Sequence, residues 1–230
     1  MPSFLFPIEQ FKSQPKGSIA VTLSIHKDSD FLHSGLAFRD GDQISFLHLA
    51  SYKSLRCEDL YQIAGDYVFF IYTNFSHLIK TDPHFFRRKA LIAYLKAIYE
   101  KNKQTIPYSF LYKKVPFDKE RKFNPELGQI GLTCSTFVMA ALEDNGIFLC
   151  NKDSWPARHD DVEIRKRIIS IYNEDPRVPK EHLAIMESEL YCVRFRPEEV
   201  LCASGRFPVP CNFKDTVECS EKALSNIKNK

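Results

Sequence analysis

The stretch His33–Ala50, HSGLAFRDGDQISFLHLA, gives the clearest indication of the fold. Apolar and polar residues alternate on both sides of Asp40-Gly41, and such a dipeptide between two alternating runs is the strongest short-range signal of a β-hairpin. With Asp40 and Gly41 as the loop, His33 lies opposite His48. Opposite residues on antiparallel strands share a face, with Cβ atoms about 4.5–5.5 Å apart. The sequence therefore predicts two imidazole rings side by side.

The two faces of this hairpin have different compositions. The histidine face also carries the small residues Gly35 and Ala37, which leave room above a histidine. The other face is apolar and can pack into a core. Alternatively, both histidines have only a structural role, with their ring nitrogens hydrogen-bonded on a half-buried sheet. A one-residue bulge in the hairpin would also move His48 to the opposite face.

Outward from the hairpin, hydrophobic periodicity predicts the remaining elements. Strands are predicted at residues 18–26, 67–73 and 190–195. Helices are predicted at residues 85–102, starting near Asp82-Pro83, at 133–145, closed by Gly146, at 160–172, and for a turn from Pro197. The remaining segments are predicted to be irregular (103–131), an insertion or cap (148–180), and a frayed helix or tail (218–230). The predicted class is α+β, with an antiparallel sheet packed on a helix in one domain over residues 1–230.

Composition excludes several classes of protein. The chain has 230 residues, of which 44% are hydrophobic and 13% aromatic, too much apolar surface for a disordered chain. The 32 basic residues against 29 acidic ones give a net charge of +3, too balanced to indicate nucleic acid as a partner. No apolar run approaches the roughly 20 residues of a membrane-spanning helix. The N-terminus lacks the features of a signal peptide, so we expect cytoplasmic synthesis, with a dedicated export route left open. A monomer is the default expectation.

Seven cysteines are present, an odd number without a CxxC pair, and the default expectation is reduced thiols. A zinc site from Cys192, Cys202, Cys211 and Cys219 is disfavoured, because structural zinc sites use short-paired spacing. We therefore expect no metal and no cofactor.

Cys134 differs from the other six cysteines in its local sequence, LTCSTFVMAALEDNG. Thr133 is a predicted N-cap, which makes Cys134 the first helical residue. Unpaired backbone N–H groups and the helix dipole favour the thiolate there, and the thiolate is the nucleophilic form. A histidine could serve as its base and a third group could orient that base, roles that His33 and His48 could fill. The alternative is a buried structural cysteine.

The segments HSGLAF, LHLA and TCSTFV together resemble the circularly permuted papain-like cysteine hydrolases. These are relatives of the NlpC-type peptidoglycan endopeptidases, and their superfamily includes the lecithin–retinol acyltransferase family. The resemblance implies a permuted papain-like core, with Cys134 as nucleophile, His33 as base and His48 as the polar third member. Tyr108 in IPYSF is similar to a Pro-Tyr segment found upstream of the cysteine helix.

The resemblance implies acyl transfer, most simply by an amidase or endopeptidase acting on peptide or peptidoglycan-type amides, including one delivered as a bacterial effector. The Cys134 N–H and the Tyr108 hydroxyl would stabilise the oxyanion, and Thr133 and Trp155 are further candidates for substrate binding. A thioesterase or phospholipid acyltransferase is the alternative enzyme, favoured if aromatic residues of 110–123 line an apolar groove. An inactive binding module is the non-enzymatic alternative, selected if His33, His48 and Cys134 do not converge.

Overall fold

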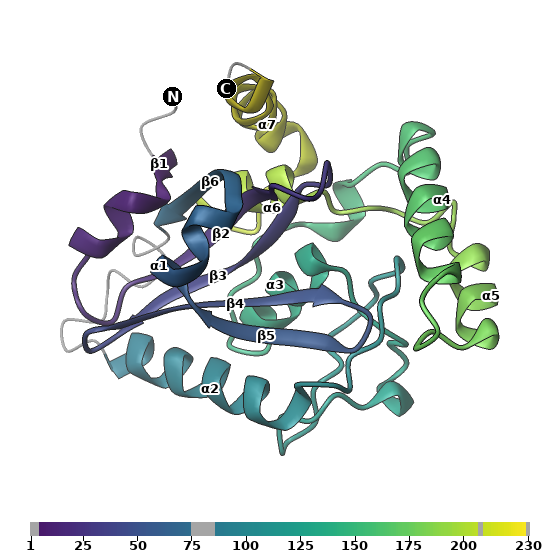
Figure 1. The fold of residues 1–230 in the computed structure, drawn as a ribbon, viewed down its shortest axis with the longest axis horizontal. Coiled ribbons are helices and arrows are strands. Elements are labelled where there is room, and N and C mark those ends of the chain that lie inside the picture. The colour runs from purple at the N-terminus through teal and green to yellow at the C-terminus, as the bar shows by residue number, and fades with distance from the viewer. Residues whose placement is uncertain (1–4, 75–85, 207–208, 229–230) are drawn as a thin grey trace.

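In the computed structural model, which describes residues 5–74, 86–206 and 209–228, the chain builds one antiparallel sheet with helices around it (Figure 1). Within that described part the sheet has six strands in the order β1-β6-β2-β3-β4-β5. Their bounds are β1 Leu5–Pro7, β2 Ile19–His26, β3 His33–Asp40, β4 Gln43–Ser51, β5 Ser54–Asp59 and β6 Tyr67–Asn74. The predicted α+β class with an antiparallel sheet is confirmed, and β1 and β5 are additions to the predicted strands.

The β3–β4 hairpin forms, but its register differs from the predicted one by two residues. Asp40 pairs with Gln43 and Ala37 pairs with Phe46, so the loop is Gly41-Asp42 and not Asp40-Gly41. Gly41 has φ 63° at the first loop position, where glycine adopts the left-handed conformation at no steric cost. The predicted loop would instead have placed Asp40 there. A shift of two residues preserves the faces, so the two histidines still share one.

The helices are α1 Leu60–Ile63, α2 Phe86–Asn102, α3 Cys134–Glu143, α4 Asp160–Asn173, α5 Lys180–Ser188, α6 Pro197–Ser204 and α7 Phe213–Lys228. The predicted helices in 85–102, 133–145 and 160–172 are confirmed, and the proposed start at Asp82-Pro83 lies outside the described residues. The α3 helix packs on the sheet face formed by residues such as Leu36 and Leu47. The opposite face, with Ala37, Ile44 and Phe46, packs against the N-terminal 3-10 helix Ile8–Ser13 and α1. The α4–α5 pair stands to one side of the sheet (Figure 1).

The predicted strand at 190–195 is wrong, because this segment is irregular. Its backbone carbonyls are bonded to a buried side chain and not to a neighbouring strand. The guanidinium of Arg165, on α4, donates to the carbonyls of Leu190 and Cys192 and is completely buried. The segment thereby fixes α4 to the body of the protein.

The prediction that all cysteines are reduced is wrong for two of the seven. Cys202 on α6 and Cys219 on α7 form a disulfide across a sequence separation of 17 residues. The segment 218–230, predicted to be a frayed helix or a tail, belongs up to Lys228 to a longer helix that begins at Phe213. The pairing also uses two of the four cysteines considered as zinc ligands.

Candidate active site

Cys134 is the first residue of α3, as predicted, and a capping box fixes the start of the helix. The Thr133 hydroxyl accepts a hydrogen bond from the Thr136 N–H at 3.1 Å, and the Thr136 hydroxyl accepts one from the Thr133 N–H at 2.7 Å. The backbone N–H groups of Cys134 and Ser135 lie in the first turn, where a helix offers no internal acceptor. Cys134 is thus a buried thiol at the end of a helix that carries partial positive charge.

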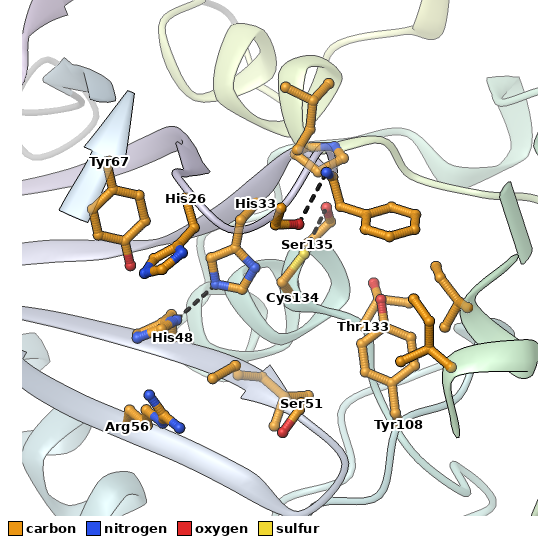
Figure 2. Close-up of a pocket in the computed structure, with 18 of the residues that line it drawn as sticks. His26, His33, His48, Ser51, Arg56, Tyr67, Tyr108, Thr133, Cys134 and Ser135 are labelled. Atoms are coloured by element: carbon orange, nitrogen blue, oxygen red, sulfur yellow. Dashed lines mark hydrogen bonds between the residues drawn. The ribbon is translucent and has the colours of Figure 1, made fainter. Parts of the chain in front are cut away.

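The two histidines are in direct contact, although they are diagonal neighbours across the hairpin. His33 Nε2 lies 2.7 Å from His48 Nδ1 (Figure 2). Gly35 makes room for this arrangement. A Cβ atom at Gly35 would lie 2.4 Å from the Phe46 ring and 2.8 Å from the Cβ of His48. The small residues on the histidine face therefore provide the space that the sequence predicted for them.

Glu58 on β5 extends this pair, and sequence reasoning missed it. Its Oε2 lies 2.8 Å from His48 Nε2. Burial lowers the pKa of His48 to about 4, so the ring is neutral at pH 7. The hydrogen bond from His48 holds the pKa of Glu58 below its ordinary value, so this carboxyl is ionised. The sequence feature that could have indicated Glu58 is the alternating segment SLRCED, which follows β4 after one tight turn. Its pairing with β4 puts Glu58 diagonal to His48.

These charges determine where the protons of both rings lie. An ionised carboxylate only accepts hydrogen bonds, so neutral His48 carries its proton on Nε2 and offers the lone pair of Nδ1. His33 must then donate from Nε2, which leaves Nδ1 as the atom that faces the thiol. In Figure 2 the His33 ring lies between His48 and Cys134. The chain Glu58–His48–His33–Cys134 therefore has a defined direction, in which Nδ1 of His33 is the atom that can exchange a proton with the sulfur.

The thiol of Cys134 is the most acidic in the chain. Burial by itself raises its pKa, but the nearby charge and hydrogen bond of His33, with hydrogen bonds from Ser34, outweigh burial and lower the pKa to about 6. All seven cysteines lie in the described part of the chain, and burial raises the pKa of each of the other four free thiols. The Ser34 hydroxyl also donates to the Ser135 hydroxyl at 3.4 Å, and the sequence did not indicate this role for Ser34.

A cavity of about 480 Å³ opens on Cys134, His33 and His48, within the range of small-molecule sites. Tyr108 and Thr133, the residues predicted to stabilise the oxyanion and to bind substrate, both line it. In Figure 2, Tyr108 and Thr133 lie on the side of Cys134 away from His48. Burial, then the nearby Cys134, raises the pKa of Tyr108 well above its ordinary value, so its hydroxyl stays protonated and can donate a hydrogen bond.

Trp155 does not line this cavity, contrary to the predicted role in substrate binding. It is 4% exposed, and its indole N–H donates to Glu199 at 3.0 Å. Its ring packs between Phe195 and Phe213. A buried carboxylate acceptor and two aromatic neighbours make Trp155 part of the core.

The predicted insertion at 148–180 has two different parts. Residues around Trp155 belong to the core, whereas α4 contributes Ile168, Ile171 and Tyr172 to the cavity wall. Tyr172 is a second site residue that the sequence did not indicate. Burial and the proximity of Cys134 raise its pKa, so it is a second protonated hydroxyl near the sulfur.

Among the described residues, no cluster of three or more His, Cys, Asp or Glu side chains is arranged to hold a metal ion. The helices in the same part of the chain include none that is long and apolar enough to span a membrane. Comparisons with protein-family models, curated proteins and solved structures find no match to this chain. The chemistry assigned to this site therefore depends on its geometry.

Proposed function

We propose that this protein is a cysteine hydrolase with a permuted papain-like core, which transfers an acyl group to Cys134 and then to water. One observation carries the proposal: the pKa of a buried thiol is lowered by a neighbouring histidine, His33, which is itself in contact with His48 and through it with Glu58. A nucleophile, a base and an orienting group in contact are the arrangement that covalent acyl transfer requires.

In the first half-reaction the Cys134 thiolate attacks the carbonyl carbon of an amide or ester. A carbon–sulfur bond forms and the carbonyl electrons move to oxygen. The N–H of Cys134 and the hydroxyl of Tyr108, which lines the same cavity, would stabilise this oxyanion. The intermediate collapses, the leaving nitrogen or oxygen takes the proton from His33 Nδ1, and a thioester remains on Cys134.

The second half-reaction reverses these roles. Water gives a proton to His33 Nδ1 as its oxygen attacks the thioester carbonyl. The thiolate leaves, the acid is released, and His33 again holds the proton that pairs with the sulfur. Throughout, Glu58 and His48 hold the His33 ring in one tautomer, and Nδ1 remains the atom that exchanges protons.

Peptide-type amides are the first substrate class to consider, following the resemblance of the sequence to permuted endopeptidases. A binding module without catalysis is less well supported. In such a module, His33, His48 and Cys134 would have no reason to lie together, and the pKa of Cys134 would have no reason to differ from that of the other cysteines.

Trapping of the acyl-enzyme tests the proposal. The protein is mixed with p-nitrophenyl acetate, and the release of p-nitrophenol is followed together with the intact mass and the modified peptide. We expect a burst of one equivalent and one acetyl group on Cys134. Both disappear in Cys134→Ala and persist in Cys57→Ser, which removes a different free thiol that, unlike Cys134, is partly exposed. Acetylation spread equally over the free cysteines would refute the proposal.

A further inference from the structure

The cavity has two sides of different chemistry. On the His33 side lie His26, Arg56, Glu58 and Asp66, together with the Tyr67 ring. Two contacting pairs stand among these groups: the ring centres of His26 and Tyr67 are 5.4 Å apart, and Arg56 lies 3.8 Å from Glu58. In Figure 2 the labelled residues His26, Arg56 and Tyr67 are all on the far side of His33 from Cys134. We call this set the polar arm.

The other side of the cavity is mainly apolar, and Arg194, whose guanidinium is paired with the buried Asp161, also lines the cavity next to Phe195. This side is lined by Phe110, Ile168, Ile171, Tyr172 and Phe195, which we call the apolar arm. The Tyr108 ring connects this arm to the nucleophile, since its centre lies 6.0 Å from that of Phe110 and 5.3 Å from that of Tyr172. Phe110, Tyr172 and Phe195 are buried, while Ile171 on α4 is 53% exposed. The wall is therefore fixed in the core and ends at an accessible apolar rim.

The direction of proton transfer determines which part of a substrate each arm receives. The leaving group must be reached by His33 Nδ1, so it lies on the His33 side of the scissile bond. The acyl part stays on Cys134 and extends the other way. We propose that the substrate carries a bulky apolar acyl group, bound in the apolar arm, and a polar leaving group, bound in the polar arm. This inference rests on the proposed function.

Two kinds of acyl group share this chemistry, a straight fatty acyl chain and an acyl residue with a large apolar amino-acid side chain. Both gain from removal of apolar surface from water. Each methylene buried in the transition state is worth about a fourfold gain in kcat/KM. The gain stops where the arm is full, and it does not apply to methylenes on the leaving-group side.

The test uses two series of substrates with constant leaving groups. One is the p-nitrophenyl esters from acetate to octanoate, and the other is the p-nitroanilides of N-acetylglycine, N-acetylalanine, N-acetylleucine and N-acetylphenylalanine. We expect kcat/KM to rise by about fourfold per methylene in at least one series. A rise confined to the esters identifies a fatty acyl group, and a rise confined to the anilides identifies an apolar residue. Lengthening the alcohol of a hexanoate ester should give a much smaller gain than lengthening its acyl chain.

Two matched variants locate the effect. Ile171→Ser should lower the octanoate-to-acetate ratio of kcat/KM several-fold, or the leucine-to-glycine ratio if the anilides respond. Phe148→Ser removes an apolar side chain that is 52% exposed and outside the cavity, and it should leave the ratio unchanged. Acylation of Cys134 that does not depend on the acyl group overturns this inference alone. Absence of acylation by every substrate overturns the proposed function and this inference with it.

Discussion

Replacement of His33 by alanine tests the thiol–imidazole pair most directly, because the pKa of Cys134 depends on two opposing effects. Burial raises this pKa and His33 lowers it, with the balance at about 6 against an ordinary value of 9.0. The difference corresponds to about 4 kcal/mol in favour of the thiolate. Without His33 only Ser34 opposes burial, so the titration midpoint should move to about 9 or above.

The size of the rate change at one pH is smaller than this shift suggests. At pH 7 the thiolate fraction should fall from about nine-tenths to about 1%, roughly a 90-fold loss. A thiolate of higher pKa is also more nucleophilic, and a Brønsted coefficient of about 0.4–0.5 over three units recovers roughly 15–30-fold. The net loss at pH 7 is only about 3–6-fold. The midpoint of the pH profile is therefore the informative quantity.

The assay follows thiol–disulfide exchange with a neutral pyridyl disulfide from pH 5 to 10, with peptide mapping to isolate Cys134. His26→Ala is the matched control, since His26 lines the same cavity without a hydrogen bond to the sulfur. We expect a midpoint near 6 in the natural protein and in His26→Ala, and one near 9 or above in His33→Ala. A midpoint near 9 in the natural protein, or the same midpoint in all three proteins, would show that His33 does not lower the pKa of Cys134.

Three further outcomes follow from the same contacts. Glu58→Gln removes the charge that orients His48. Because a hydrogen bond to a charged group is worth about 1.5–3 kcal/mol, kcat should fall about 10–100-fold with little change in KM. An unchanged kcat would contradict the role assigned to Glu58. The pKa of His48 is lower in the folded state, at about 4, than its ordinary value of 6.5, so the folded state resists protonation and stability should fall as the pH decreases from about 6.5 to 4. Urea unfolding should show a loss of about 2 kcal/mol between pH 7 and pH 5 that is absent in His48→Gln, and an equal loss in both proteins would assign the effect to other groups. Gly35→Ala should cost about 1–3 kcal/mol in urea unfolding, because its Cβ would meet Phe46, whereas Gly65→Ala meets nothing within 4 Å and should be neutral; equal stabilities would show that the space at Gly35 is not needed.

The sequence was sufficient to predict the hairpin and the cysteine helix because both have strong local signals. Asp40-Gly41 marks a turn within one residue, and Thr133 before an apolar helical stripe marks an N-cap. The register was wrong because the same dipeptide fits two loops, and the choice between them depends on which residue adopts the left-handed conformation. Such a choice is made by backbone sterics that composition does not reveal.

The residues that were missed have partners distant in sequence or on another element. Glu58 contacts His48 across a strand pair, and Tyr172 reaches the cavity from a helix assigned to an insertion. Trp155 was misplaced for a related reason. A lone tryptophan in a polar segment suggests an exposed contact, but the acceptor that allows its burial, Glu199, lies 44 residues further along the chain. Pattern and spacing do not specify contacts of this kind.

The site also depends on where along the strand its residues lie. The α3 helix packs on one face of the sheet, and the two histidines lie on the other, so a nucleophile from α3 would normally be separated from them by the sheet. His33 is the first residue of β3. Because the strand does not extend beyond it, a side chain at this end of the sheet can be reached from both faces. Ser34, the next residue, faces α3 and contacts Ser135, which brings the helix N-terminus to this end. The adjacent positions His33 and Ser34 thus connect the two faces, which explains how a histidine pair on one side of the sheet lies beside a thiol presented from the other.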